Sequence, residues 1–341
     1  MALVQEYFLW LRDHFLIPLY HRAIVFFTPS DGLFIGYLFS ALLIAVLYYA
    51  YSSRDTNLRA ALKELLAAHN LNSRSAKDDV LLFFFDKVFL GFIYSFVVGA
   101  AFFFRAEVMQ LLSYAGVPTT HAIPGITLSI VLTLLSLLAF DFAVFFEHYL
   151  SHKILFLWEF HKIHHIAEDL NPLTAYRSHP VNQCCFILMV SLFSGTYSGV
   201  VGYFFDSSHA YVLFAGQNLF MFILLILGLN LQHSRVFIRY PRIIRSILIS
   251  PAYHQLHHSS DRQHHDINFG FIFSFWDFFF KTQYLPSSEK HLKFGVSGEK
   301  YETYAGIRNT YLVPFRKAFL RLKRKVTKSK PAYTNKQENP R

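Results

Sequence analysis

Charged residues are scarce in this chain, and their scarcity argues against an ordinary soluble domain. Lys, Arg, Asp and Glu together make up 16% of the 341 residues, whereas soluble domains carry about 25%. Hydrophobic residues make up 53% and aromatic residues 18%, and Phe alone occurs 39 times. This composition, together with long apolar runs, is typical of an integral membrane protein.

Cysteine is nearly absent, and the sequence has neither a glycine-rich phosphate loop nor a dinucleotide fingerprint. The two cysteines, Cys184 and Cys185, are adjacent in an apolar run. They cannot build a disulfide framework, and we interpret them as small packing residues. The formal net charge is +10, and basic residues concentrate in 308–341. We interpret this stretch as a basic tail beside anionic lipid, so no nucleic-acid partner is expected.

Five apolar runs are long enough to enter a bilayer, which takes about 20 helical residues. Basic residues are frequent in loop 52–79 but rare in 105–124 and 205–209. The positive-inside rule therefore places 52–79, 148–180 and 231–341 in the cytoplasm and the N-terminus on the far side. The N-terminal residues mix charges with apolar side chains and predict an amphipathic interfacial helix. The predicted spans are 33–51, 82–104, 125–147, 181–204 and 210–230, the last two forming a tight helical hairpin.

Histidine is abundant and clustered. Thirteen of the 18 histidines fall between positions 148 and 265, in one HxxxH motif at 148–152 and two HxxHH motifs at 161–165 and 254–258. On a helix, residues i, i+3 and i+4 share one face, so each motif directs two or three imidazoles toward one point. Imidazole is the commonest transition-metal ligand in proteins. The spacing predicts a metal site with two ions but leaves iron, zinc, copper and nickel open.

Asp141 is an acid inside the otherwise apolar span 125–147, seven residues before His148. Ionisable residues inside a membrane are functional candidates by default, and metal-bound imidazoles usually donate their second N–H to a carboxylate or carbonyl. We predict that Asp141 does this for a ligand such as His165 or His258. Further candidates for the same role are Asp266, Asn268 and Asp277.

These motifs identify a resemblance to a known family. The run DFAVFFEHYLSHKILFLWEFHKIHHIAEDLNPLTAYRSHP, then NLQHS, then SPAYHQLHHSSDRQHHDINFGFIFSFWD, resembles the fatty acid hydroxylase/sterol desaturase superfamily over about 141–285. The resemblance implies that the motif histidines bind two iron ions and that the histidine of NLQHS completes the set. The histidine of RSHP is a further candidate ligand, although the proline after it indicates a helix start. The expected metal-binding residues are His148, His152, His161, His164, His165, His179, His233, His254, His257 and His258.

The chain departs from its relatives in two places. Many relatives carry a Tyr-Trp pair and an Arg in the first histidine motif, where this chain has Phe145, Phe146 and Tyr149. Relatives commonly show Phe-Gly-Thr after the Trp-Asp pair, where this chain reads Phe-Phe-Lys-Thr at 279–282. These differences concern packing rather than ligands, so they bear on the identity of the substrate more than on the chemistry.

The resemblance implies an all-α integral membrane bundle of about four to five membrane-embedded helices with a cytoplasmic helical cap that carries the di-metal site. It implies an enzyme that uses O2 and two electrons to hydroxylate or desaturate a lipid, such as a sterol, fatty acyl chain or alkylglycerol. From its position inside an apolar span, Asp141 is the candidate catalytic residue. The chain contains no haem or flavin domain, so the electron donor is expected to be separate: a ferredoxin, a cytochrome b5-like protein or a reductase. The expected division is an N-terminal part at 1–124, a catalytic region at 125–290 and a basic tail at 291–341.

Two other functions fit parts of the pattern. A histidine-rich transition-metal transporter or metal-binding membrane protein is the main alternative, but transporters place their ligands near the bilayer midplane, and the spans here hold little polar besides Asp141. A zinc hydrolase is the other alternative, since zinc accepts three histidines and a water. The histidine motifs offer no carboxylate base for it.

Overall fold

The computed structural model describes residues 25–54, 57–286 and 292–328, and the described chain is mostly helical with little strand. This confirms the predicted all-α class. The amphipathic helix predicted at the N-terminus falls almost entirely outside the described residues, which begin with a short 3-10 turn, Val25–Phe27.

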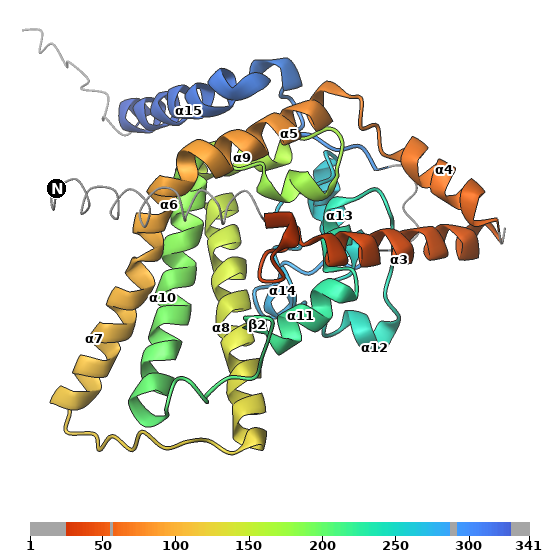
Figure 1. Ribbon diagram of the computed structural model, residues 1–341. Helices are drawn as coiled ribbons and strands as arrows, with labels where there is room; N and C mark the ends of the chain where they lie inside the picture. Colours follow the sequence, from red (N-terminus) through yellow and green to blue (C-terminus); the bar gives the residue numbers. More distant parts are fainter. Residues whose placement is uncertain (1–24, 55–56, 287–291, 329–341) are drawn as a thin grey trace, which may run out of the picture.

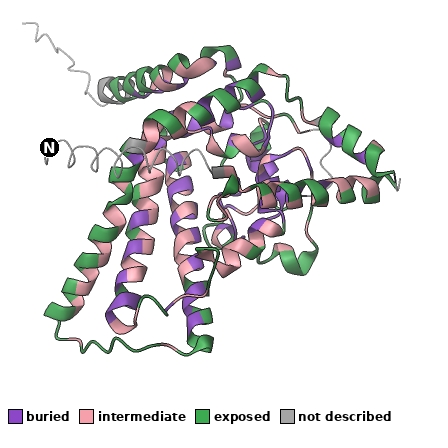
Figure 2. Ribbon diagram, viewed as in Figure 1, coloured by how far each residue is buried: buried purple, intermediate pink, exposed green. Residues whose placement is uncertain are grey.

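Three long helices stand side by side and form a bundle (Figure 1). Helix α10 packs against both α7 and α8. The apolar stretch that includes α7 begins in α6, so that residues 93–114 are long and apolar enough to cross a membrane, as are α8 and α10. Figure 2 shows α7 with exposed and half-buried residues only, as expected of a helix that faces lipid. The helices are α6 (Gly91–Val98), α7 (Ala100–Tyr114), α8 (Ile126–Lys153) and α10 (Pro180–Phe204).

Glycines let α10 approach α7 closely. A Cβ at Gly195 would lie 2.6 Å from the carbonyl oxygen of Ala101, and one at Gly199 would lie 2.8 Å from that of Arg105. Small residues four apart are the usual means by which membrane helices bring their backbones together. The α7–α10 contact therefore depends on the absence of side chains at these two positions.

A fourth apolar helix, α3 (Ile35–Ser53), is also long enough to cross a membrane, but it runs crosswise to the bundle (Figure 1). Near its start, Tyr37 packs in a cluster with Leu137 of α8. Farther along, Ala45 packs with Leu231, which lies outside the bundle. The described residues thus contain four candidate spans, in line with the predicted membrane bundle.

The second predicted span starts later than expected. Helix α5 (Arg74–Phe85) is followed by a π-helical turn, Asp86–Leu90, and the candidate span begins only at Ile93. Asp86 accepts a hydrogen bond from the Tyr94 hydroxyl at 2.7 Å. The polar pair Asp86 and Lys87 lies in this turn, so the sequence 82–104 is not one uninterrupted apolar helix.

The predicted span 210–230 is wrong as a continuous helix. Residues Leu213–Phe214 (β1) and Gln217–Asn218 (β2) form a two-stranded hairpin, and only Leu219–Ile226 is helical (α11). The turn of the hairpin uses positive φ angles at Ala215 and Gly216. Gly228, with φ of 89°, follows α11. A helix of eight residues is about 12 Å long, too short to cross a bilayer.

Most of the remaining elements form a cap at the end of the bundle where α8 finishes and α10 begins, whereas α12 and α14 lie lower, to the side of the bundle (Figure 1). Two of them, α9 (Leu155–His165) and α13 (Pro251–His257), carry HxxHH motifs. The others are α4 (Leu58–Ala68), α12 (Arg242–Arg245), α14 (Phe275–Phe279), α15 (Gly306–Lys328) and the short 3-10 segments η4 (Pro172–Tyr176), η5 (Leu229–His233), η6 (Arg262–His264) and η7 (Tyr301–Thr303).

The basic C-terminal segment packs on the cap as far as it is described. Helix α15 lies along α9, and buried Lys162 of α9 contacts Glu159 at 2.7 Å and Glu299 at 3.0 Å. Arg321 of α15 forms an ion pair with the same Glu159. The basic tail expected at 291–341 therefore contains a helix over Gly306–Lys328, and residues 329–341 lie outside the described part of the chain.

Candidate metal centre

Nine imidazole side chains converge in the cap, in two adjacent groups. Within each group the potential ligand atoms all lie within 4.8 Å of one another. The helical spacing brings them together because α8, α9 and α13 each turn one histidine-bearing face toward the same point. The first group contains His148, His152, His161, His165 and His257, and the second contains His164, His233, His254 and His258.

The two groups share their helices. His164 and His165 are neighbours on α9, so they point in different directions, and each belongs to a different group. Likewise α13 and its C-cap give His257 to the first group and His254 and His258 to the second. The rings of His165 and His258 stack with their centroids 4.6 Å apart. Each of the two HxxHH motifs therefore contributes histidines to both groups, which places the two groups next to each other.

The spacing of nitrogen atoms in the first group fits a metal ion. Nε2 of His165 lies 3.1 Å from Nε2 of both His152 and His257 and 3.2 Å from that of His161. A single imidazole nitrogen cannot satisfy three others by hydrogen bonding. Two nitrogens that each lie about 2.1 Å from one ion, at right angles around it, are separated by about 3.0 Å. The observed distances are those of nitrogens arranged around a common ion.

The second group shows the same spacing. Nε2 of His233 lies 3.1 Å from Nε2 of His164 and 3.1 Å from that of His254. Nε2 of His258 lies 3.2 Å from that of His254. The residues present therefore fit two metal ions held by imidazole alone.

Backbone carbonyls orient two ligands of the first group. The Nδ1 atom of His148 lies 2.8 Å from the carbonyl oxygen of Phe269, and that of His257 lies 2.7 Å from the carbonyl oxygen of Ile267. A carbonyl can only accept, so the ring proton must sit on Nδ1, and Nε2 keeps its lone pair for a metal. Nε2 of His148 is buried without a hydrogen-bond partner among the described residues.

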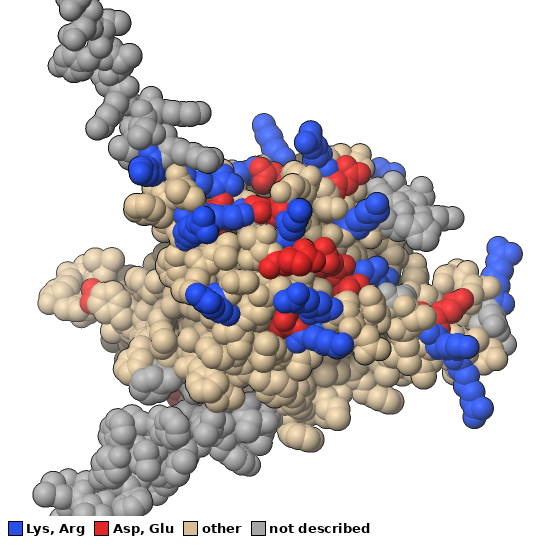
Figure 3. All heavy atoms as spheres, turned by 90° about the horizontal axis from the view of Figure 1, so that it is seen from above, with Lys and Arg blue, Asp and Glu red and all other residues tan. Residues whose placement is uncertain are grey.

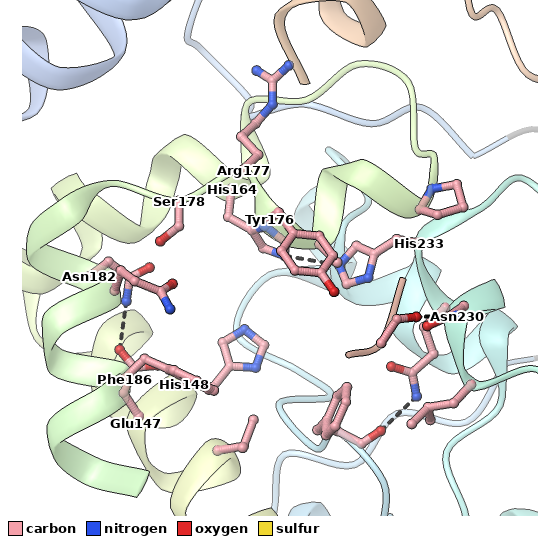
Figure 4. Close-up of a pocket in the computed structure, with 18 of the residues that line it drawn as sticks. Glu147, His148, His164, Tyr176, Arg177, Ser178, Asn182, Phe186, Asn230 and His233 are labelled. Carbon is pink, nitrogen blue, oxygen red and sulfur yellow. Dashed lines mark hydrogen bonds between the residues drawn. The ribbon is translucent and has the colours of Figure 1, made fainter. Parts of the chain in front are cut away.

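Side chains orient two more ligands of this group. Nδ1 of His161 donates to Oδ1 of Asn182 at 2.9 Å, and the amide nitrogen of Asn182 donates to Glu147 at 2.7 Å (Figure 4). Nδ1 of His152 lies 3.5 Å from Asp266, whose side chain is 53% exposed. Glu147 thus acts on a metal-site histidine through an amide, whereas Asp266 contacts one directly from the surface.

Burial keeps these histidines neutral. It lowers the pKa of His164 to about 3. Burial likewise lowers the pKa of His165, His233, His254 and His258 well below the ordinary 6.5, and neighbouring imidazoles lower it further. Only the neutral ring can bind a metal, so the site is in its ligating form at neutral pH.

A cavity of about 560 Å³ adjoins the two groups. Histidines of both groups line it, and Figure 4 shows His148, His164 and His233 around the open space. Much of the wall comes from α8, α10 and α11 and is apolar. The apolar lining residues include Phe140, Val144, Phe186, Met221, Leu225 and Phe271.

The cavity also carries fixed polar groups. The Gln232 amide donates from Nε2 to the carbonyl oxygen of Phe271 at 2.7 Å, which fixes the orientation of the amide. Its Oε1 is buried and has no partner among the described residues, so it can accept a hydrogen bond. Asp86 and Lys87 of the π-helical turn line another part of the wall. An occupant with both apolar and polar parts suits this lining.

The structure does not place Asp141 as predicted. Its buried carboxylate accepts hydrogen bonds from the backbone N–H of Ile272 at 2.8 Å and of Phe273 at 3.0 Å, and from the indole of Trp276 at 3.0 Å. These partners occupy the carboxylate, and they are loop and α14 residues rather than histidines. The prediction that Asp141 hydrogen-bonds a metal-site histidine is therefore wrong: Asp141 anchors segment 272–276 to α8.

His179 also lies outside both groups. It is the N-cap of α10, where Nδ1 accepts from the backbone N–H of Val181 at 3.1 Å, and Nε2 donates to the carbonyl oxygen of Tyr311 at 3.1 Å. Both ring nitrogens are engaged by the protein, so His179 is a capping residue here and not a metal ligand. Pro180 at the first helical position is the matching sequence signal.

The other predicted acids and amides have different positions. Asp277 accepts from the backbone N–H of Phe269 and of Gly270, both at 2.8 Å. It thereby holds the residue whose carbonyl contacts His148. Asn268 hydrogen-bonds backbone groups of Tyr253 and Tyr284, so its role is to close a loop.

Sequence reasoning missed Asn182, Glu147 and Gln232. A signal was available for Asn182, because it is a polar residue in the first turn of an otherwise apolar span. Glu147 directly precedes a motif histidine, as Gln232 does. Polar residues next to metal-binding positions at the end of a span merit attention as orienting groups.

The chain was compared with protein families, curated proteins and solved structures. Residues 133–282 match the family model described as fatty acid hydroxylase, and this stretch contains all nine clustered histidines. No curated protein and no solved structure matches the chain.

Proposed function

We propose that this chain is a membrane-bound di-iron oxygenase, because residues 133–282 match the fatty acid hydroxylase family model, which is part of the fatty acid hydroxylase/sterol desaturase superfamily. It uses O2 and two electrons to hydroxylate or desaturate a C–H bond of a lipid. The observation that carries the proposal is the convergence of nine imidazoles, in groups of five and four, beside a largely apolar cavity.

Iron is the metal that the family supports, because the imidazole set by itself also suits zinc, copper and nickel. When bound, a pair of irons would supply the activation of O2 that oxidation of an unactivated C–H bond requires. The chain's own residues orient the rings: the carbonyl oxygens of Phe269 and Ile267 and the amide of Asn182 fix three of them. Pre-oriented ligands reduce the reorganisation that metal binding requires.

The cavity supports a lipid as the substrate. Its volume of about 560 Å³ lies within the range of pockets that hold small ligands, about 300–1,000 Å³. Its apolar wall excludes water and would hold a hydrocarbon segment against the metal-site histidines, which raises the effective concentration of the target C–H bond. Gln232 and the Asp86–Lys87 turn offer hydrogen bonds to a polar part of the same molecule.

We place the cap and the C-terminus in the cytoplasm. Figure 3 shows Lys and Arg side chains spread over the face above the bundle, with some acidic residues among them. Helix α15 contributes exposed Arg308, Arg316 and Arg321. This agrees with the positive-inside rule. A separate electron donor, such as a ferredoxin, a cytochrome b5-like protein or a reductase, would then reach the cap from the cytoplasm.

Lipid analysis of cells with and without the protein tests the proposal. Cells that express it should accumulate a lipid with one added oxygen atom or with two hydrogens fewer. The variant His257→Ala should lose this product, because it removes a member of the first group. His209→Ala is the matched control: this histidine lies exposed in the loop at the opposite end of the bundle, and its removal should leave the product unchanged. Equal product from wild type and His257→Ala would refute the assignment.

A further inference from the structure

Both halves of α3 are attached to the same short stretch of chain. Just before the helix, the carbonyl oxygen of Gly32 accepts from the Asn230 amide at 2.8 Å. In its last turns, the Tyr48 hydroxyl donates to the carbonyl oxygen of Phe237 at 2.8 Å. Residues 230–237 surround His233, a member of the second metal group. The two ends of α3 therefore lie beside a segment held close to the metal centre.

Helix α8 runs from one end of the bundle to the other, and its length can be compared with that of α3. One end carries His148 and His152. Near the other end, Ser129 donates to the carbonyl oxygen of His209 at 3.0 Å, in the loop at the opposite end of the bundle. Ser129 and His148 are 19 positions apart on the helix, which corresponds to about 28 Å. The 19 residues of α3 have the same length, yet the helix does not reach that opposite end.

The direction of α3 agrees with these contacts. It runs crosswise to α7, α8 and α10, and the turns of α3 and α8 are both seen from the side in Figure 1. Membrane-spanning helices tilt by up to about 40° from the bilayer normal. Two helices that run crosswise to each other cannot both stay within that limit. If α7, α8 and α10 cross the bilayer, α3 cannot cross it as well.

One face of α3 is nevertheless exposed and apolar from end to end. Residues at intervals of four, which share one side of a helix, are exposed: Ile35 by 55%, Phe39 by 68%, Leu43 by 48% and Leu47 by 50%. Water is a poor partner for so long an apolar stripe. Lipid chains already surround the neighbouring bundle if it spans the membrane, so they are the partner nearest to this face.

We propose that α3 lies in the plane of the leaflet nearest the metal centre, with the acyl chains of that leaflet covering its exposed stripe. Gly32, at the start of α3, lines the cavity, so the placement brings the cavity wall to the depth of that leaflet.

The proposal changes the expected topology. A spanning α3 has its two ends on opposite sides of the membrane, whereas an in-plane α3 has both ends on the side of the metal centre. The positive-inside pattern places the chain before α3 on the far side if every predicted span crosses. An in-plane α3 moves the start of this helix to the cytoplasmic side and leaves the histidine motifs where they were.

Cysteine labelling of the full-length protein in sealed, uniformly oriented vesicles distinguishes the two arrangements. Single cysteines replace exposed serines in a Cys184→Ala, Cys185→Ala background, and a membrane-impermeant maleimide is the probe. In-plane α3 predicts that the two positions flanking α3 label from the same side as the cap control and opposite to the far-loop control. Labelling of the position before α3 together with the far-loop control would overturn the proposal. The variants are Ser30→Cys and Ser53→Cys at the ends of α3, Ser297→Cys as the cap control and Ser113→Cys as the far-loop control.

Spin labels along the exposed stripe give a second measurement that does not need access from water. Spin labels replace Ile35, Phe39, Leu43 and Leu47 one at a time. The rates at which each label collides with oxygen and with a water-soluble nickel complex report its depth in the bilayer. An in-plane helix predicts similar depths at all four positions. A depth that rises from Ile35 to a maximum near Leu43 and then falls would show a spanning helix and contradict the proposal. Both experiments read membrane placement, so they stand whether or not the protein proves to be an oxygenase.

Discussion

At the residue scale, the orientation of each ligand depends on a group that is not itself a ligand. His161 is the clearest case, because Asn182 accepts its Nδ1 proton while Glu147 holds the Asn182 amide in place. A flipped amide would present a donor to His161 and favour the wrong tautomer. The carboxylate therefore influences the metal site without touching it.

We predict that Asn182→Leu weakens metal binding by about 10–100-fold, the usual cost of losing such an orienting partner. The neighbouring Gln183 also lines the cavity but contacts none of the nine histidines through a hydrogen bond that the described structure contains. Gln183→Leu is therefore the matched control. Competition with a chelator measures both, and equal metal retention in the two variants would contradict the role given to Asn182.

The buried histidines make stability depend on pH. The folded pKa of His164 is about 3, below the ordinary 6.5, so the unfolded chain binds the additional proton as the pH falls. The contribution of the neutral, buried ring to the free energy of unfolding is complete above pH 6.5 and is lost as the pH falls from 6.5 towards 3. Thermal unfolding of the metal-free protein should shift to lower temperature over this range, and a midpoint that stays constant between pH 7 and 5 would contradict this.

Sequence reasoning selected eight of the nine clustered histidines because their spacing places them on one face of a helix, which is a local property. The ninth, His233, was selected from the family resemblance. Sequence reasoning also placed His179 among them, although Pro180, which follows it, is the usual signal of a helix start. Asp141 was assigned to a histidine because seven residues separate it from His148. Its true partners, at 272–276, lie more than 130 positions away and cannot be read from the helix pattern.

At the element scale, two buried acids hold the loop that faces the metal site. Asp141 ties segment 272–276 to α8, and Asp277 ties Phe269 and Gly270 into the loop. Gly270 has no room for a side chain, since a Cβ there would lie 2.3 Å from Ile249 and 2.9 Å from Asp277. Hydrogen bonds to its backbone therefore fix the loop, and with it the position of the Phe269 carbonyl that orients His148.

We predict that Asp277→Asn lowers both stability and metal retention. The carboxylate accepts four hydrogen bonds, and the amide nitrogen of Asn cannot accept those made to one of its two oxygens. Each buried donor left unpaired costs about 1–3 kcal/mol. Asp261→Asn, at an exposed cap of η6, is the control. Thermal unfolding and bound metal measure both variants, and an unchanged Asp277→Asn would show that this anchor is dispensable.

The close packing of α10 against α7 gives a further prediction. Gly195→Val places side-chain atoms where the Ala101 backbone lies, since the Cβ alone would be 2.6 Å from its carbonyl oxygen. Separating α7 from α10 should lower the free energy of unfolding by about 1–3 kcal/mol. Val200→Leu, at a position 40% exposed on the same helix, should have little effect. Equal unfolding temperatures for the two variants would contradict close backbone packing.

Apolar length predicted most of the long helices, but not where the chain breaks. The run 210–230 is apolar enough to span, yet Ala215 and Gly216 turn it into a hairpin, because their positive φ angles are compatible with a turn and not with a helix. The run 33–51 does form a helix, as predicted. Its direction depends on distant contacts through Gly32 and Tyr48, which no local pattern contains.

At the scale of the whole molecule, the metal centre lies between the membrane bundle and the cap. The bundle contributes His148 and His152, and the cap contributes the other seven clustered histidines. The cavity reaches both groups, and its wall combines residues of the bundle with residues of α11, η4 and η5. Composition and motif spacing predicted this position at the membrane edge. The cavity lining could not be predicted, because it combines short pieces from distant parts of the chain.

Metal analysis of the purified full-length protein tests the central claim most directly. Two groups of converging imidazoles predict close to two iron ions per chain, and His164→Ala and His257→Ala should each lower this content because they remove a member of a different group. Protein that is folded by its thermal transition yet carries no transition metal, or that keeps its full iron content without either histidine, would contradict the account.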